Sequence, residues 1–269
     1  MGRFQLIRGD CLEVMKGIAD ASVDLILADL PYGTTKCSWD SVIPLEPMWE
    51  QYLRIAKPNA AIVLCAAQPF TSMLVASRPD LFRYEWIWEK GNATGFLNAK
   101  KQPLRAHESA LVFYRKQPVY NPQMTSGHAR KTSTRAQRSE VYGQAGEVTS
   151  YDSTERYPRT VQFFSSDKQK SSYHPTQKPV AWMEFLVRTY TNPGMLVLDN
   201  TCGSGTSGVA AMQCGCDYIG IDKDCGEDGE PLGYLDTALH RILESVPEEQ
   251  GNALTGCNTQ LLQQQTLQL

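Results

Sequence analysis

The sequence predicts an α/β protein with a mostly parallel sheet that is covered by helices on both faces. Three observations support this prediction. Apolar runs of strand length alternate with amphipathic stretches of helix length over most of the chain. The run at residues 23–29 is apolar nearly throughout, which is typical of a parallel strand buried on both faces. A glycine-rich loop, residues 199–208, follows an apolar strand and opens a helix.

Five of the expected strands lie in the first 114 residues. Amphipathic helices are expected near residues 12–15 and 48–56, in the intervals between the first three of these strands. The glycine- and lysine-bearing stretch 91–105 predicts a loop between the last two. The five strands are expected at residues 4–7, 23–29, 61–65, 82–88 and 110–114.

The regular pattern stops at residue 116 and resumes after residue 172. Residues 115–172 contain ten Lys and Arg against five Asp and Glu, whereas residues 222–249 contain nine acids against two bases. The basic segment predicts an inserted subdomain or a mobile loop that faces phosphates, although a solvated loop would have the same composition. After it we expect a helix at 180–190, a strand at 195–199, a helix after Gly208 and a strand at 218–222.

Composition argues against several other classes of protein. The chain begins without the apolar segment of a signal peptide, and its longest apolar run, residues 60–67, is far shorter than the roughly 20 residues of a membrane span. Eight cysteines are present, but none forms a Cys-x-x-Cys pair, and His is scarce. We therefore expect reduced thiols, no metal site, no membrane association and a soluble cytoplasmic protein.

The loop at residues 199–208 is the clearest candidate for a nucleotide site. Its glycines let the backbone turn tightly and approach a ligand closely. Asp222 ends the next strand, where a carboxylate can accept hydrogen bonds from both ribose hydroxyls. The ligand could be a dinucleotide or S-adenosylmethionine, and the turn could also serve the fold alone. Asp199 favours S-adenosylmethionine, because a carboxylate suits its cationic sulfonium and amino groups better than a diphosphate.

The turn Asp29-Leu30-Pro31-Tyr32 is the candidate for the chemistry. It follows a buried strand at the edge where parallel sheets bind ligands. The carboxylate of Asp29 can accept a hydrogen bond from an aromatic amine, and Pro31 fixes the backbone so that a carbonyl accepts the second amine hydrogen. Tyr32 can stack on a base that has been flipped out of a duplex. An ordinary strand-to-turn exit with a capping Asp is the alternative interpretation.

Together these segments resemble the motifs of the DNA amino-methyltransferases. Residues 29–32 resemble their Asp-Pro-Pro-Tyr catalytic motif, and residues 199–206 resemble their S-adenosylmethionine loop. The segment 174–179, His-Pro-Thr-Gln-Lys-Pro, is similar to the one that contacts the methionine carboxylate of the cofactor. The order of catalytic motif, variable segment and cofactor motif is that of the β class. The chain looks most like small solitary adenine methyltransferases of phages and prophages, which also carry Cys-x-Trp-Asp, here residues 37–40.

The resemblance implies a fold, a domain organisation and a cofactor. The fold is the Rossmann-like S-adenosylmethionine-dependent methyltransferase fold in its circularly permuted β-class form, with seven strands. Residues 1–114 are then expected to form the catalytic half, 115–172 a target-recognition insertion or mobile loop, and 173–246 the cofactor-binding half. The composition of residues 247–269 predicts a flexible Gln-rich tail. The implied cofactor is S-adenosylmethionine. The residues implied to bind it are Asp10, Thr176, Gln177, Lys178, Asp199, Asn200, Thr201, Cys202, Gly203, Ser204, Gly205, Thr206 and Asp222.

Two positions depart from the family pattern. Leu30 replaces the first proline of the catalytic motif, which leaves the amine-accepting carbonyl less rigid. Thr201 and Cys202 stand where many members place a Phe, a change that concerns the contacts to the methionine part of the cofactor and not the loop itself. The first change is compatible with the reaction because position 30 acts through its backbone.

The implied reaction is direct in-line transfer of a methyl group to an exocyclic amine, with Asp29, Leu30, Pro31 and Tyr32 as catalytic residues. In the family, an initial Asp is associated with adenine N6 and an initial Ser with cytosine N4. Adenine is therefore favoured, cytosine N4 is the alternative, and an RNA adenine substrate is not excluded. Methylation at cytosine C5 would need a Pro-Cys nucleophile, which the sequence lacks.

Two other classes account for fewer of these features. A nicotinamide-dependent oxidoreductase would explain the glycine loop and Asp222, but not the turn at residues 29–32 or the basic insertion. A nucleic-acid-binding protein without activity would not need both Asp29 and Gly203.

The implied partner is double-stranded DNA with the target base flipped out, and a homodimer is left open. Basic residues of the insertion are expected to meet phosphates and base edges, and lysines near the catalytic edge to hold the flipped strand. The expected DNA contacts are Lys90, Lys100, Lys101, Arg130, Lys131, Arg135 and Arg138.

Overall fold

The computed structural model describes residues 2–33, 40–139, 143–165, 177–226 and 229–246, with the backbone alone at 135–139 and 143–149. The chain divides into two compact units. The larger unit comprises Met1–Asn121 and Thr160–Leu269, and the smaller unit comprises Pro122–Arg159.

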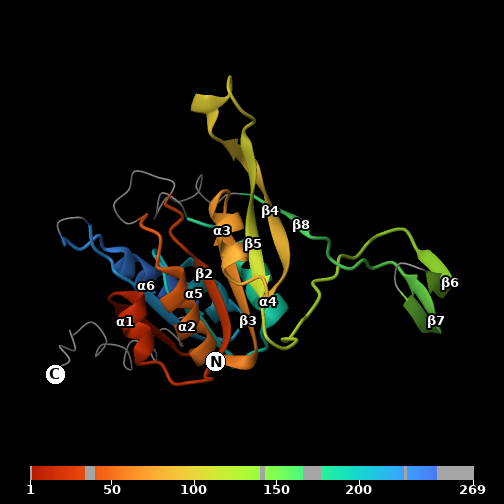
Figure 1. Ribbon diagram of the computed structural model, residues 1–269, viewed down its shortest axis with the longest axis horizontal. Coiled ribbons are helices and arrows are strands. Elements are labelled where there is room, and N and C mark those ends of the chain that lie inside the picture. The colour runs from red at the N-terminus through yellow and green to blue at the C-terminus, as the bar shows by residue number, and fades with distance from the viewer. Residues whose placement is uncertain (1, 34–39, 140–142, 166–176, 227–228, 247–269) are drawn as a thin grey trace. The chain divides into compact units, whose positions relative to one another are not determined.

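The larger unit is built on one mixed sheet with the strand order β1-β10-β9-β2-β3-β5-β4-β8 (Figure 1). Strands β1, β10, β9, β2 and β3 run parallel, β5 runs antiparallel to β3 and β4, and β8 is parallel to β4. The prediction of a mostly parallel sheet is therefore confirmed. The strands are β1 (Phe4–Arg8), β2 (Val23–Asp29), β3 (Ala56–Ala66), β4 (Phe82–Thr94), β5 (Arg105–Phe113), β8 (Val161–Phe164), β9 (Leu196–Asp199) and β10 (Asp217–Asp222).

The sheet has eight strands where the sequence predicted seven. The additional strand is β8, which pairs with residues 87–90 at the edge of the sheet. Val161 and Phe163 on this strand are exposed, so its four residues carry no clear apolar pattern. It is held by its neighbours: the indole of Trp88 donates to the carbonyl of Phe164 at 2.8 Å, and the Phe164 ring packs against Trp182.

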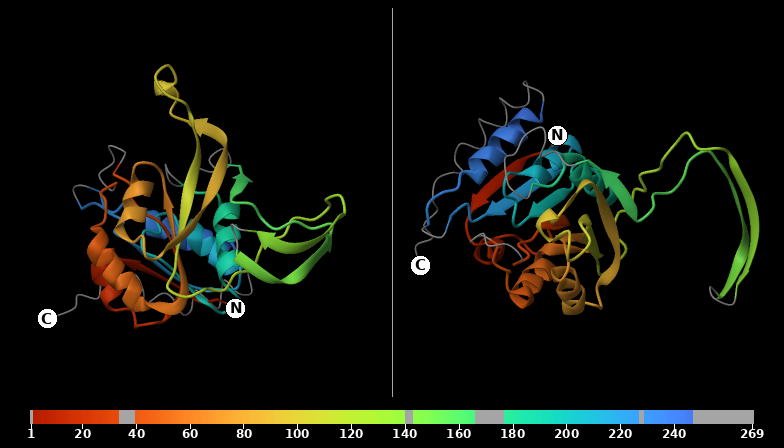
Figure 2. Two further views of the ribbon diagram at one scale, coloured as in Figure 1. Left: turned by 45° about the vertical axis from the view of Figure 1, so that its right-hand side comes forward. Right: turned by 90° about the horizontal axis from the view of Figure 1, so that it is seen from above.

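Helices cover both faces of the sheet, as predicted (Figure 2). Successive side chains of strand β2 point to opposite faces of the sheet. Leu25 and Leu27 belong to the core beneath α4, α5 and α6, while Ile26 and Ala28 belong to the core beneath α1, α2 and α3. The helices are α1 (Cys11–Lys16), α2 (Leu45–Ile55), α3 (Phe70–Ser77), α4 (Val180–Tyr190), α5 (Thr206–Gln213) and α6 (Tyr234–Glu244).

Strands β4 and β5 continue beyond the rest of the sheet as a long hairpin, drawn in yellow in Figures 1 and 2. Residue Thr94 near the far end of β4 pairs with Arg105 at the start of β5. The short helix η1 (Phe96–Asn98) forms the tip. We call residues 91–107 the β4–β5 arm.

The smaller unit contains a separate antiparallel pair, β6 (Lys131–Ser139) and β7 (Gly143–Ser153). Its function in target recognition stays a prediction.

The described ranges contain neither a candidate membrane span nor a candidate metal cluster. No helix there combines the length and the apolar character that a membrane span requires. The cysteines in the same ranges are free thiols, and no cluster of His, Cys, Asp and Glu suited to a metal ion occurs there.

Candidate active site and cofactor pocket

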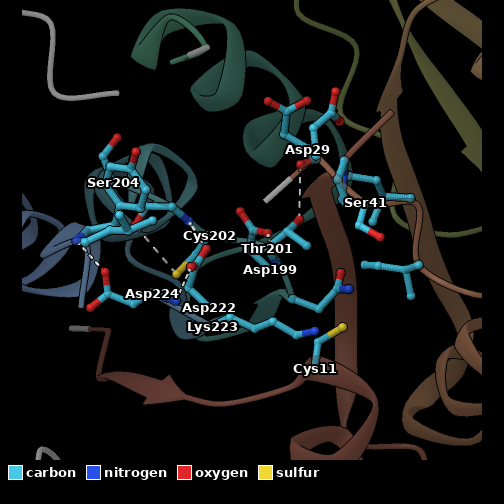
Figure 3. A pocket seen from close by; sticks show the side chains of 18 of the residues that line it. Cys11, Asp29, Ser41, Asp199, Thr201, Cys202, Ser204, Asp222, Lys223 and Asp224 are labelled. Carbon is cyan, nitrogen blue, oxygen red and sulfur yellow. Dashed lines mark hydrogen bonds between the residues drawn. The ribbon is translucent and has the colours of Figure 1, made fainter. Parts of the chain in front are cut away.

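A cavity of about 470 Å³ lies at the carboxyl ends of the central parallel strands (Figure 3). Its wall includes the ends of β1, β2, β9 and β10 and the loops that follow them. Such an edge collects loops from both halves of the chain, because parallel strands all end there. The volume is within the range of about 300–1,000 Å³ that is usual for small-molecule sites.

Asp29 is the last residue of β2, and both of its carboxylate oxygens are occupied. The Tyr32 hydroxyl donates to Oδ1 at 2.8 Å, and the Lys178 ammonium donates to Oδ2 at 2.6 Å. Burial raises the pKa of Tyr32 well above its usual value, and nearby carboxylates add to this effect, so the phenol stays a donor. The Tyr32 ring stacks on Phe70 with centroids 5.5 Å apart. Asp29 is thus held in one orientation by two donors.

Lys178 links Asp29 to Glu108 and Lys90 in a series of alternating charges. Its ammonium lies 3.1 Å from Glu108 Oε2, and Lys90 donates to Glu108 Oε1 at 2.5 Å. Burial alone would lower the pKa of Lys178, but Asp29 and Glu108 outweigh it and raise that pKa. Burial likewise opposes the ionisation of Glu108, but the two lysines hold its pKa below the usual value. Lys178 and Glu108 therefore remain charged at neutral pH.

The predicted cofactor loop connects β9 to α5. Asp199 accepts hydrogen bonds from the backbone N–H of Thr201 at 3.0 Å and the Ser207 hydroxyl at 2.5 Å. Burial raises the pKa of Asp199 to about 7, and the two donors only partly oppose this. Asn200 accepts a hydrogen bond from Tyr52 at 2.6 Å, while its amide nitrogen is buried without an oxygen partner among the described residues.

Two glycines set the shape of this loop. Gly203 and Gly205 have φ of 48° and 75°, which is left-handed backbone that favours glycine. A Cβ at Gly205 would also lie 2.7 Å from the Cβ of Ala238 on α6. The carboxylate of Asp222 accepts from the N–H of Gly203 at 2.8 Å and from the N–H of Asp224 at 2.8 Å. Asp222 thus fixes the loop from the end of β10.

Asp10 lies on the other side of the pocket as the N-cap of α1. Its Oδ1 accepts from the N–H of Leu12 at 2.9 Å, and Lys223 lies 2.9 Å from its Oδ2. The hydrogen bond from Lys223 lowers the pKa of Asp10, so the group is ionised at neutral pH.

The two predicted motifs meet directly. The Thr201 hydroxyl of the glycine loop donates to the backbone carbonyl of Asp29 at 3.2 Å, across 172 positions of sequence. Most of the residues implied by the motifs line the same cavity. They are Asp10, Asp29, Leu30, Pro31, Tyr32, Gln177, Lys178, Asp199, Asn200, Thr201, Cys202, Gly203, Ser204, Thr206 and Asp222.

Gly205 lies in the loop but does not line the cavity, and Thr176 lies outside the described residues. Sequence reasoning did not identify Glu108, which lies on β5 and contacts Lys178. Nothing near Glu108 in the sequence indicated a lysine partner 70 positions away.

The predicted DNA contacts are in different environments. Lys90 is 10% exposed and paired with Glu108, whereas Lys100 and Lys101 lie on the exposed β4–β5 arm. In the smaller unit, Arg130 forms an exposed ion pair with Asp152 at 2.6 Å, and Lys131 begins β6. Arg135 and Arg138 also belong to β6, but their side chains lie outside the description.

Comparisons with known proteins agree with this geometry. Residues 23–226 match the family model described as DNA methylase, whose name covers N6 and N4 methylation. DNA adenine methyltransferase YhdJ of Escherichia coli (strain K12) is 26% identical over 260 residues, which cover 90% of this chain and 85% of that protein.

Two solved structures show the same fold. The M1.HpyAVI–SAM complex has a TM-score of 0.59 at 24% identity, covering 88% of this chain and 99% of that one. The PvuII DNA methyltransferase, described as cytosine-N4-specific, has a TM-score of 0.65 at 16% identity, covering 95% of this chain and 92% of that one.

Proposed function

The chain belongs to the DNA methylase family of N6 and N4 methyltransferases, and from this premise we propose that it methylates the N6 amine of adenine in double-stranded DNA, with S-adenosylmethionine as the methyl donor. The observation that carries the proposal is the hydrogen bond between Thr201 and Asp29. This bond joins the catalytic turn to the cofactor loop, and both segments line one cavity. Methyl transfer between two bound molecules requires such proximity.

The residues of the cavity fit S-adenosylmethionine. Carboxylates at Asp10 and Asp222 suit the adenosine, and Asp199 lines the same cavity as a partner for a cation. Asn200 lines the same cavity, and its buried amide nitrogen, which has no oxygen partner among the described residues, is a hydrogen-bond donor at that wall. When bound, the cofactor supplies an electrophilic methyl group on a sulfonium.

The protein positions the target amine and supplies hydrogen-bond acceptors for it. Asp29 accepts one hydrogen of the target amine, and the carbonyl of Leu30 accepts the other, which turns the nitrogen lone pair toward the methyl donor. The Tyr32 hydroxyl now occupies Asp29 Oδ1, so an amine that uses this oxygen displaces it. Tyr32, once released from Asp29, can stack on the base. A base in a duplex reaches the site only after it is flipped out.

Adenine is proposed over cytosine because the catalytic turn begins with Asp, and the name of the relative YhdJ points the same way. The fold does not discriminate, since PvuII methyltransferase is described as cytosine-N4-specific. Either amine lies beside a ring nitrogen and could use Asp29 in the same way. The family assignment rules out the nicotinamide oxidoreductase considered from the sequence. Action on DNA would place the enzyme in the cytoplasm of a bacterial or phage-infected cell.

Transfer from labelled S-adenosylmethionine to unmethylated DNA, digested to nucleosides and resolved by mass, is expected to yield N6-methyl-2′-deoxyadenosine. N4-methyl-2′-deoxycytidine would contradict the base assignment but keep the mechanism. An RNA of the same sequence serves as the comparison substrate. Label in RNA with none in DNA would overturn the proposed substrate.

Cofactor binding is expected to tighten as the pH rises from 6 to 8, because of Asp199. A carboxyl group with a pKa of about 7 is mostly protonated at the lower pH and mostly ionised at the higher one. Only the carboxylate attracts a cation, so the apparent Kd should fall about tenfold over this range.

Calorimetric titration of S-adenosylmethionine at both pH values would measure this change. Asp199→Asn is the matched control, because the amino group of the cofactor titrates equally in both proteins. A variant that keeps the full tenfold tightening would exclude Asp199 as its source.

A further inference from the structure

The β4–β5 arm buries almost nothing of its own. Every residue from Asn92 to His107 is exposed except Gly95, which is partly buried. At the tip, Phe96 is 80% exposed and Leu97 is 99% exposed. Such side chains contribute nothing to the two cores of the protein, so a partner is needed to explain an apolar tip on so long an extension.

The tip is ordered rather than loose. Gly95 has a φ of 93°, and helix η1 begins directly after it. The N–H of Asn98 donates to the carbonyl of Gly95 at 2.9 Å, and the N–H of Lys101 donates to the carbonyl of Asn98 at 2.8 Å. These bonds hold Phe96 and Leu97 together at the end of the arm.

The charge of the arm selects the class of partner. Residues 91–107 include Lys100, Lys101 and Arg105 and no Asp or Glu. A wholly basic, acid-free surface around an apolar tip is complementary to a polyanion that also offers apolar surface, and stacked bases between two phosphate chains meet both conditions.

The root of the arm lies at the catalytic site. Lys90 and Glu108, the residues that flank it, are joined to each other at 2.5 Å, and Glu108 is linked through Lys178 to Asp29. At about 3.3 Å per residue, the strand from Lys90 to Thr94 carries the chain about 13 Å outward. This exceeds the roughly 8 Å depth of a DNA groove, so the tip can reach the base stack near a target held at Asp29.

We propose that Phe96 and Leu97 act as a wedge that enters the duplex beside the target and fills the space left by the flipped base. The inference rests on the proposed function and adds an interaction surface to it. Flipping a base out of an intact duplex costs free energy because the base loses its stacking contacts. Apolar side chains that enter between the neighbouring bases lower this cost. Lys100 and Lys101 hold the phosphates on either side.

The test compares two DNA substrates that carry the methylation site mapped in genomic DNA. One is a matched duplex, and the other has an abasic position opposite the target, so that the base is already loosely stacked. For the double variant Phe96→Ser/Leu97→Ser, we expect methylation of the matched duplex to fall about 10- to 100-fold at saturating DNA. Its rate on the abasic duplex should stay within about threefold of the unaltered protein.

Two control variants separate this role from others. Met73→Ser removes an exposed apolar side chain from α3, which is not part of the arm, and should change neither rate. Lys100→Ala/Lys101→Ala should weaken binding of both DNAs alike and reduce the dependence of binding on salt.

Several outcomes would overturn the wedge. Equal losses of methylation rate on both duplexes would show a general defect of the variant. Unchanged rates on both would show that the tip does not contribute to methylation. Loss of a dimer in the double variant by sedimentation would assign the tip to a second copy of the chain. If the unaltered protein methylates no DNA at all, the proposed function fails as well, and this result differs from every outcome in which only the variant changes.

Discussion

Asp29→Asn is expected to lower the rate of methyl transfer by about 100- to 1,000-fold, with cofactor binding changed by less than about threefold. The substitution keeps the size of the side chain and one acceptor oxygen. It removes the charge that strengthens the hydrogen bond to the target amine as the nitrogen becomes positive. Lys178 keeps Glu108 as a partner, so the fold should tolerate the change.

Single-turnover transfer and calorimetric cofactor binding would measure the two effects separately. Asp24→Asn is the matched control, because Asp24 lies on the same strand and pairs with Lys57 at 2.7 Å, at the end of β2 away from the cavity. It should leave the rate nearly unchanged. A similar loss of rate in both variants would mean that strand β2, rather than the carboxylate at its end, is what the reaction requires.

Lys178→Met is expected to destabilise the protein by about 3 kcal/mol at neutral pH. The Lys178 side chain is 6% exposed and neutralises two partly buried carboxylates, Asp29 and Glu108. Met has a similar shape but leaves these acids facing each other, with Lys90 as the remaining cationic partner of Glu108 among the described residues. Removing one partner of a buried ion pair is destabilising because the other charge is left unpaired in the protein interior, where the dielectric constant is low.

The pH dependence of this loss has a definite sign. The lysines hold the pKa of Glu108 below its ordinary value of 4.5, so its contribution to stability is present above that pH and is lost as the pH falls through the lowered pKa. The difference between the two proteins should therefore shrink as the pH falls below about 4.5. Urea unfolding at pH 7.5 and at pH 4 would measure it.

Lys57→Met, which breaks the pair with Asp24 where the lysine is 39% exposed, is the control and should cost less than about 1 kcal/mol. A Lys178→Met protein as stable as the original at neutral pH would contradict the role given to this lysine.

The parts of the fold that the sequence predicted are those decided by neighbouring residues. Residues 23–29 were recognisable as a strand because a parallel strand covered on both faces is apolar at nearly every position. The strand β8 was not, since its four residues are ordered by Trp88 and Trp182 from other segments. A local pattern cannot report a strand that is stabilised only by distant partners.

The same distinction divides the site. Asp29, Asp199 and Asp222 could be identified because each follows an apolar strand, and the ends of parallel strands meet at one edge. Glu108 could not, because its environment is made by Lys178 and by Lys90 on a neighbouring strand. The direct contact between Lys178 and Asp29 was also not foreseen, since the motif that contains the lysine implied a contact to the cofactor.

The strand order has a consequence for how each copy of the protein is made. Strand β1 pairs with β10, and β2 pairs with β9 on the side opposite β3. Both strands therefore lack these partners until residues 196–222 have been synthesised. At typical ribosome speeds the intervening stretch takes on the order of ten seconds to synthesise. For that interval the nascent chain carries two apolar strands with unpaired backbone, the state in which chains associate with one another or are bound by chaperones.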